Sequence, residues 1–171
     1  NTGGGGSTGT TCGTETFETI PASSSSYSTR TWTSNSITWT ATDARTDQNL
    51  NNRAILIQNG SLTSSTISGG MGSLTVSTKQ YYSGSAGSFN LLINGTVVGT
   101  IPYTSSTSSS GGTITTTTIS NINLTGNNVI KLTNNSTSTR VAIDDLSWTC
   151  YNDLGTDETT VNKFSIYPNP V

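Results

Sequence analysis

Short segments in which apolar and polar residues alternate dominate the chain. Ile37, Trp39 and Ala41, for example, alternate with threonines. Alternation of this kind predicts a β-strand with one buried and one exposed face. The same reasoning predicts strands at 14–20, 27–33, 37–42, 74–82, 88–93, 96–103, 113–124, 129–133 and 140–150. Residues 54–58 are almost continuously apolar, so we expect that strand to be buried on both faces.

Polar turns separate these segments at regular intervals. Asn94-Gly95 is a typical type I′ hairpin turn, and the serine run 23–26 and residues 126–128 are further turns. No segment with helical periodicity and helix-forming residues is long enough to predict a helix. About ten short strands joined by polar turns predict an all-β fold, an antiparallel two-sheet β-sandwich of the jelly-roll type.

The alternation changes phase within the last strand. Val141 and Ile143 begin an apolar face, but Leu146 and Trp148 continue it one position out of step. Because side chains along a strand repeat every two residues, the change requires one extra residue, which a β-bulge supplies. The bulge is therefore predicted at the adjacent carboxylates Asp144-Asp145.

The composition excludes several classes of function. Of the 171 residues, 30% are hydrophobic and 9% are charged, and the net charge is −2. A chain of this length can bury a core as one domain, and such a low net charge is not typical of disorder. Nucleic-acid binding would need clustered Lys and Arg, and no apolar run is long enough to span a membrane. With no histidine, Ser–His and Cys–His catalysis are excluded.

Cys12 and Cys150 are the only cysteines, and they lie 138 positions apart near the two ends of the strand-rich region. We predict that they form a disulfide, which would bring the first and last strands side by side and would indicate an oxidising compartment. The alternative is a pair of free, buried thiols.

Composition also divides the chain along its length. Residues 1–11 are a Gly/Ser/Thr-rich linker, which implies a further domain upstream. Residues 12–151 form the predicted β-sandwich module, and residues 152–162 are a polar, acidic linker. Residues 163–171 differ from both and are treated as a separate segment.

That last segment reads Lys163-Phe-Ser-Ile-Tyr-Pro-Asn-Pro-Val171. It resembles the opening of the C-terminal sorting domain of Bacteroidetes proteins exported by the type IX secretion system. The resemblance implies a secreted or cell-surface-attached protein, with residues 163–171 as the start of a truncated sorting domain.

The body of the chain, from TETFETI through RTWTSNSITWTATDARTDQ to VAIDDLSWT, resembles non-catalytic modules appended to secreted Bacteroidetes enzymes, which include polysaccharide-degrading enzymes and some extracellular endonucleases. More distantly, the Phe-Glu near the start and the Ile-Asp-Asp near the end resemble the jelly-roll carbohydrate-binding modules. In those modules the Glu after the Phe and an Asp of the pair hold a structural calcium, which implies Glu18 and Asp144 here. With Asp145 beside Asp144, the candidate metal ligands are Glu18, Asp47, Asp144 and Asp145, and Asp43 is the rival for the third position.

The residues themselves also point to a cation. Two carboxylates at a strand kink repel each other unless a positive charge lies nearby, and calcium takes oxygen ligands in flexible geometry. Two alternatives involve no metal. The carboxylates could accept backbone N–H bonds at the bulge, or Arg140 could neutralise one of them.

Candidate sugar-binding residues are aromatic or cationic. A pyranose ring packs its C–H face on an aromatic plane, while arginine matches a sulfate or carboxylate with two hydrogen bonds. The candidates are Arg30, Trp32, Arg45, Lys79, Tyr81 and Tyr82. Trp39 and Trp148 share faces with apolar neighbours and are predicted to lie in the core. The three cations suggest an acidic or sulfated algal polysaccharide.

We therefore predict a non-catalytic, monomeric carbohydrate-binding module that targets an upstream catalytic domain to a polysaccharide. Catalysis is not expected, because the acids cluster at one strand pair rather than facing each other across a cleft. One alternative is a structural or adhesion spacer without a ligand. A second is a small polysaccharide lyase or hydrolase.

Overall fold

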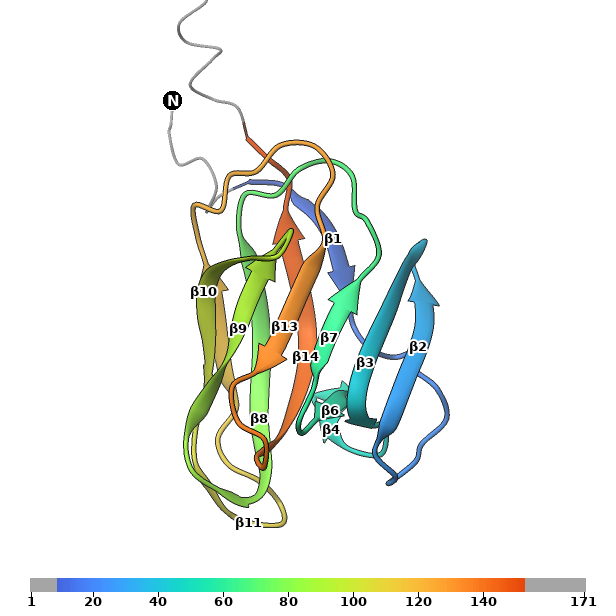
Figure 1. The fold of residues 1–171 in the computed structure, drawn as a ribbon, viewed down its shortest axis with the longest axis vertical. Coiled ribbons are helices and arrows are strands. Elements are labelled where there is room, and N and C mark those ends of the chain that lie inside the picture. Colours follow the sequence, from blue (N-terminus) through green and yellow to red (C-terminus); the bar gives the residue numbers. More distant parts are fainter. Residues whose placement is uncertain (1–8, 153–171) are drawn as a thin grey trace, which may run out of the picture.

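In the computed structural model, which describes residues 9–152, twelve strands join into one sheet that curls back on itself (Figure 1). All the strand pairs are antiparallel. The predicted all-β jelly-roll sandwich is thereby confirmed. Within the described residues, no helix is long and apolar enough to cross a membrane.

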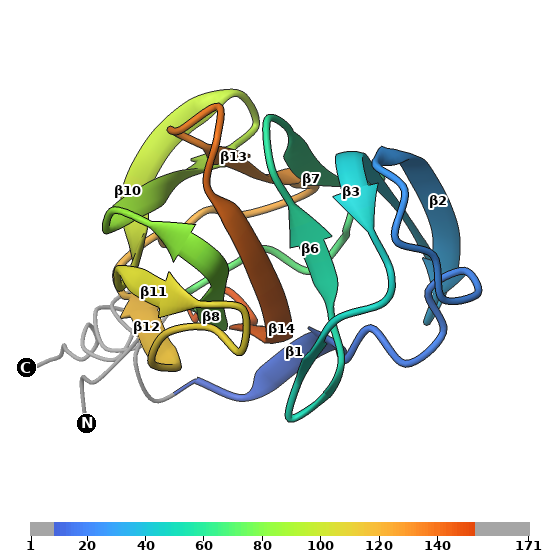
Figure 2. The same cartoon turned by 90° about the horizontal axis from the view of Figure 1, so that it is seen from below.

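The order of strands along the curled sheet defines two halves that face each other across the core (Figure 2). One half consists of β10 (Thr96–Tyr103), β9 (Gly87–Ile93), β13 (Ile130–Asn134), β7 (Ser61–Ser64), β3 (Ile37–Arg45) and β2 (Ser28–Ser34). The other half consists of β6 (Ile55–Ile57), β14 (Arg140–Thr149), β8 (Leu74–Gly84), β11 (Ser106–Ser108), β12 (Thr115–Ile119) and β1 (Thr11–Glu15). The short strands β4 (Asn49–Leu50) and β5 (Asn52–Arg53) form a separate hairpin.

Strand β3 connects the two halves because it has different neighbours along its length. Residues 39–41 pair with β7, whereas Ala44 and Arg45 pair with β6. Asp43 lies at the change, with a φ of 49°, and its carboxylate accepts a hydrogen bond of 2.8 Å from the Asn59 amide. Asp43 therefore fixes the corner at which the sheet curls.

The main core lies between the two halves and follows the predicted alternation. Trp39 and Trp148 are both buried, with ring centroids 6.3 Å apart, as predicted. On the opposite face of β6, β14 and β8, a smaller apolar cluster forms beneath loop 46–53. Its buried members are Leu50, Ala54, Leu56, Tyr81 and Ala142. The strand predicted at 54–58 is buried on both faces as expected, since Ile55–Ile57 contribute to both clusters.

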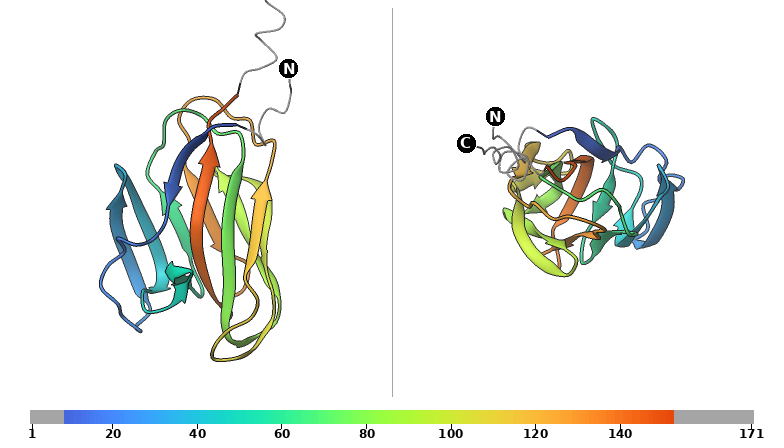
Figure 3. Two further views of the ribbon diagram at one scale, coloured as in Figure 1. Left: turned by 180° about the vertical axis from the view of Figure 1, so that it is seen from behind. Right: turned by 90° about the horizontal axis from the view of Figure 1, so that it is seen from above.

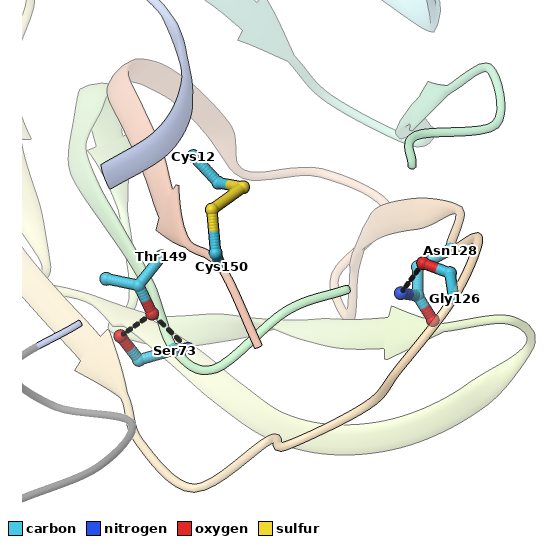
Figure 4. The surroundings of a disulfide bond; sticks show 6 residues. All are labelled: Cys12, Ser73, Gly126, Asn128, Thr149 and Cys150. Carbon is cyan, nitrogen blue, oxygen red and sulfur yellow. Dashed lines mark hydrogen bonds between the residues drawn. A yellow bond between two sulfur atoms is a disulfide. The ribbon is translucent and has the colours of Figure 1, made fainter. Parts of the chain in front are cut away.

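A disulfide joins the two ends of the domain. Cys12 and Cys150 are bonded with a Cα–Cα distance of 4.8 Å, and β1 pairs with β14 beside them (Figure 4). The neighbouring Thr149 hydroxyl accepts a hydrogen bond from the Ser73 amide at 2.9 Å. The chain therefore enters and leaves at the same end of the domain (Figure 3), and the predicted disulfide is confirmed.

Several strand boundaries differ from the prediction. The first strand is Thr11–Glu15 rather than 14–20, because Phe17 has a φ of 60° that turns the chain out of the extended conformation. Strands β7 and β11 were not predicted, since their serine-rich sequences carry little apolar alternation. The type I′ turn is confirmed by positive φ at both Asn94 and Gly95.

A buried polar network closes the end of the core that lies away from the disulfide. The Tyr103 hydroxyl donates to Asn134 Oδ1 and contacts the Thr139 hydroxyl, each at 2.8 Å. Burial raises the pKa of Tyr103, chiefly by desolvation. Asn134 donates in turn to the Gln58 carbonyl at 2.8 Å, so the network ties β13 to the chain before β7.

Replacing Tyr103 with Phe should lower the free energy of unfolding by about 1–2 kcal/mol, because buried polar partners would lose a hydrogen bond. The ring would keep its contact with Phe89, whose centroid lies 5.8 Å away. Urea unfolding measures the change, and Tyr82→Phe at a half-buried hydroxyl is the matched control. Equal midpoints for Tyr103→Phe and the wild type would contradict a structural role for the network.

Candidate ligand-binding face and acidic corner

Two consecutive tyrosines lie on the same outer face of β8. Side chains that follow each other along a strand normally point to opposite faces. Tyr82 has a φ of 64°, which turns its side chain to the side of Tyr81, so that the two ring centroids lie 6.3 Å apart. A left-handed conformation is costly for a bulky residue, and such strain concentrates at functional sites.

Around these tyrosines, aromatic rings and cations stack in alternation. The Arg45 guanidinium carbon lies 5.4 Å from the Tyr27 ring centroid and 5.5 Å from that of Tyr82. Arg140 lies over the Tyr82 ring at 4.7 Å, and Lys79 Nζ lies 4.8 Å from the Tyr81 ring centroid. We call this set the cation–tyrosine ladder; its members are Tyr27, Arg45, Lys79, Tyr81, Tyr82 and Arg140.

Loop 46–53 holds the ladder in place. Asp47 accepts two hydrogen bonds from Arg45, at 2.9 and 2.6 Å, which lowers the pKa of Asp47 and raises that of Arg45. Gln48 Nε2 donates to the Tyr82 hydroxyl at 3.2 Å, and the Tyr81 hydroxyl donates to the Asn49 carbonyl. Loop 46–53 therefore supplies hydrogen-bond partners to the Arg45 guanidinium and to the hydroxyls of Tyr81 and Tyr82, and these bonds fix the orientation of the ladder.

The ladder contains four of the six predicted sugar-binding residues, Arg45, Lys79, Tyr81 and Tyr82. Tyr81 is only 8% exposed and supports the face from beneath. Trp32 does not belong to the face, contrary to the prediction. It is 6% exposed, and its indole donates to Glu15 Oε2 at 3.1 Å, so its ring offers no surface to a sugar.

Arg30 lies outside the ladder as well. Its guanidinium donates to the Ser26 carbonyl at 2.6 Å and to the Ala44 carbonyl at 3.2 Å, which ties the 21–27 segment to β3. Tyr27, Gln48 and Arg140 are ladder contacts that the sequence did not reveal. They come from segments far apart in the chain, and no local spacing connects them.

The predicted bulge lies at the other end of loop 46–53. The register of β14 against β8 shifts between Asp144 and Ser147, and Asp145 has a φ of 53°. At this point β14 also changes its second neighbour, from β6 at Ile143 to β1 at Leu146. The bulge prediction is therefore confirmed, and it marks the junction of three chain segments.

Asp144 is a buried carboxyl group with an unusual proton affinity. It is 1% exposed, and desolvation is the largest cause that raises its pKa to about 7. The nearby carboxylates of Asp145 and Glu18 raise the pKa further, while backbone amides of Asp145 and Asn52 act in the opposite direction. We call Glu18, Asp144 and Asp145 the acidic corner.

The acidic corner meets part of the requirement for calcium. Its oxygen donors and the charge repulsion at Asp144 suit a hard cation. Within residues 9–152, however, no three carboxylates are gathered closely enough to form a metal-binding group. One oxygen of Asp145 accepts a bond of 2.7 Å from Asn51, so an ion would need these side chains to move.

Two of the carboxylates considered as the third ligand have other partners. Asp47 is bound through both oxygens to Arg45, and Asp43 caps the corner of β3. Asp47 is therefore withdrawn as a candidate ligand, because a calcium ion would have to displace a guanidinium from it. Glu15, buried beside β14, accepts hydrogen bonds from the Phe17 amide and the Trp32 indole instead.

A separate hollow of about 370 Å³ lies on the outer face of β3 and β7. It is lined by Thr38, Thr40, Thr42, Thr63, Ser64 and Ser65. Ser64 and Ser65 accept backbone N–H bonds from Ile130 and Thr38, and Thr42 accepts one from Ser61. The hollow has no aromatic or charged side chain in its lining, so the ladder offers the stronger recognition chemistry.

Comparison with solved structures places this architecture among known folds. Carbohydrate-binding module CBM36 in complex with calcium and xylotriose superimposes with a TM-score of 0.52 at 14% identity, covering 80% of this chain and 99% of that chain. The chain has the jelly-roll fold of carbohydrate-binding modules. The K1 cleaved adhesin domain of Lys-gingipain from Porphyromonas gingivalis gives a TM-score of 0.54 at 14% identity, covering 84% of this chain and 100% of that chain.

A further module of this kind resembles the chain less closely. The CBM36-1 domain of a multidomain xylanase from the hindgut metagenome of Trinervitermes trinervoides has a TM-score of 0.49 and 15% identity, and covers 82% of this chain and 98% of that chain. No protein-family model matches the sequence, and no curated protein matches it. At these identities the similarity establishes the fold.

Proposed function

We propose that this domain is a non-catalytic carbohydrate-binding module that holds an attached secreted enzyme at a polysaccharide. The observation that carries the proposal is the cation–tyrosine ladder on a jelly-roll scaffold. Tyrosine faces pack against the C–H face of a sugar ring, while hydroxyl, amide and guanidinium groups bond its hydroxyls. Tethering the enzyme raises its local substrate concentration without changing its chemistry.

The position of the ladder suits this role. Arg140 begins β14 and pairs with Tyr81, whereas the disulfide lies at the other end of the same strand. The ladder is therefore displaced along the sheet from the end at which the chain enters and leaves. Domains joined at that end would leave the ladder free to contact a polymer.

Affinity electrophoresis of the purified domain through gels that contain single polysaccharides tests the proposal. We expect retardation by at least one polymer and loss of the retardation in Tyr82→Ala. Normal migration in every gel would favour the spacer or adhesion alternative, a role suggested by the fold shared with the K1 adhesin domain. Release of reducing ends or unsaturated products by the domain would favour the lyase or hydrolase alternative.

The secretion and domain assignments belong to the same proposal. A secreted or surface-attached location agrees with the disulfide, which oxidising compartments favour. Linker 152–162 and the sorting-domain segment 163–171 lie, apart from Asn152, outside the described residues, as do most of residues 1–11. We retain the attached upstream enzyme and the monomeric state as predictions.

Calcium at the acidic corner is a second element of the proposal. Glu18, Asp144 and Asp145 would hold the ion together with backbone carbonyls, after Asp145 has left its bond with Asn51 and the three carboxylates have moved together. A bound divalent cation would remove the charge repulsion at the bulge and would join β14 to the 16–20 segment. The CBM36 structure described above contains calcium, which supports testing this metal first.

Asp144→Asn should change the pH dependence of stability. An unfolded aspartate has a pKa near 3.9, so between about pH 4 and pH 7 the unfolded chain releases a proton that folded Asp144 keeps. Wild-type stability should therefore fall as the pH rises through this range, by up to about 4 kcal/mol without calcium. The amide does not titrate and so removes this loss, and the variant should exceed the wild type in stability at pH 8.

Urea midpoints between pH 4.5 and pH 8, in EDTA and in calcium, measure this effect. Calcium should restore wild-type stability at pH 8 and should add much less to Asp144→Asn. Asp43→Asn, outside the acidic corner, is the control for loss of a carboxylate. Parallel pH profiles for wild type and Asp144→Asn would contradict the raised pKa, and an absent calcium response would exclude the metal.

A further inference from the structure

The positive charges of the ladder are only partly neutralised. Within residues 9–152 the single ion pair is Arg45–Asp47, with a nitrogen–oxygen distance of 2.6 Å. Within the same residues, Arg140 and Lys79 therefore have no carboxylate partner. Asp144 lies diagonally across from Lys79 on β14, yet the Lys79 ammonium lies over the Tyr81 ring instead.

Arg140 also has an unsatisfied donor. Its Nε is buried and has no hydrogen-bond partner, and a terminal nitrogen makes only a long contact of 3.4 Å with the Ser83 carbonyl. Because Nε is shielded from solvent, a ligand would bond the terminal guanidinium nitrogens, which this weak contact leaves available. The guanidinium carbon lies 4.7 Å from the Tyr82 ring centroid, and this contact restricts the side chain before any ligand arrives.

Lys79 is held in a similar way. Besides the Tyr81 ring, the backbone of Gly111 lies against its side chain, because a Cβ at Gly111 would come within 2.7 Å of Lys79 Cε. Gly111 has a φ of 95°, which favours glycine. The ammonium is thus positioned on the face rather than extended freely into solvent.

The two cations lie close enough to act together. Arg140 pairs with Tyr81 and Ala142 pairs with Lys79, so Arg140 and Lys79 are diagonal neighbours on adjacent strands. Diagonal neighbours in an antiparallel pair lie about 7–8 Å apart. One segment of a sugar chain can therefore contact both.

We propose that Arg140 and Lys79 form an anion subsite that binds sulfate-ester or carboxylate groups of a polysaccharide. The inference deepens the proposed function and rests on it. The Arg140 fork would bond two oxygens of the anionic group, and Lys79 would add a point charge beside a tyrosine face. Neutral polymers offer only uncharged hydroxyl acceptors, which bond a guanidinium less strongly than an anionic group does, and would bind more weakly.

The test measures binding of the full chain to paired polymers by calorimetry. One pair is a sulfated galactan with its desulfated form, and the other is a polyuronate with its carboxyl-reduced form. We expect at least one anionic polymer to bind about 10-fold or more tightly than its neutral counterpart, with the preference weakening as salt rises. The pair that shows the preference identifies sulfate or carboxylate as the ligand group.

Variants assign the preference to these residues. R140Q and K79Q should each reduce it several-fold, and the double variant should abolish it while residual binding to the neutral polymer persists. K131Q, at an exposed lysine on β13, should retain the full preference. If R140Q fails to fold, K79Q alone tests the subsite, because this substitution changes only the surface end of the Lys79 side chain.

Two results would overturn the inference in distinguishable ways. Equal binding of anionic and neutral polymers by the wild type would exclude the anion subsite and leave the proposed function standing. Undiminished preference in the folded K79Q and R140Q variants would place the anion elsewhere. Absence of binding to every polymer would remove the proposed function together with the subsite.

Discussion

Replacing Cys12 and Cys150 with serine is expected to lower the free energy of unfolding by about 5 kcal/mol. The disulfide closes a loop of 138 positions, so it restricts the unfolded chain strongly. It also anchors β1, an edge strand that pairs with β14. The expected fall in thermal midpoint is on the order of 10–20 °C, measured by calorimetry with and without reductant.

The pattern of local opening provides a second readout of the same change. Amide exchange in the double serine variant should accelerate first in β1 and in the last residues of β14, while the centre of β8 stays protected. Ser73→Ala, which removes side-chain contacts beside the disulfide, is the matched control and should cost about 1 kcal/mol. A loss below about 1 kcal/mol in the double variant would show that the bridge is dispensable.

Replacing Tyr82 with Ala is expected to weaken polysaccharide binding by roughly 10- to 100-fold, equivalent to about 1.4–2.8 kcal/mol. Tyr82 contacts both arginines of the ladder and the ring of Tyr81, so its removal takes away one aromatic face and a ring contact from each guanidinium group. Calorimetric titration measures the affinity, and circular dichroism checks the fold.

Tyr82→Phe separates the ring from the hydroxyl. The phenylalanine variant keeps the aromatic plane and loses only the bond to Gln48, so it should retain most of the affinity. Removing the large side chain also takes away part of the burial that offsets the φ of 64°. If folded Tyr82→Ala bound as tightly as the wild type, the ladder would not be the binding face.

The sequence predicted the features that depend on local periodicity. The change of phase between Ile143 and Leu146 located the bulge, because an alternation with a period of two residues changes phase only where the strand contains one extra residue. The burial of Trp39 and Trp148 followed from their apolar neighbours on the same face. The disulfide followed from the presence of two cysteines at the two ends of the strand-rich region.

The candidate site was less accessible, because it depends on contacts between distant segments. The Trp32 indole meets Glu15, 17 residues earlier in the chain, only in the folded domain, and the spacing of the two residues does not predict this hydrogen bond. Asp47 is two residues from Arg45, but the alternation of side chains along a strand does not show that these two form an ion pair. Arg140 joins the ladder through strand register, which sequence alone did not provide.

Backbone NMR with the polysaccharide that retards the domain most strongly locates the bound ligand directly. We expect the largest amide shifts at Arg45, Gln48, Tyr81, Tyr82 and Arg140, with little change in β2 or around the disulfide. Shifts concentrated instead at the hydroxyl-lined hollow of Thr38–Thr42, or at the disulfide end, would contradict the ladder as the binding face.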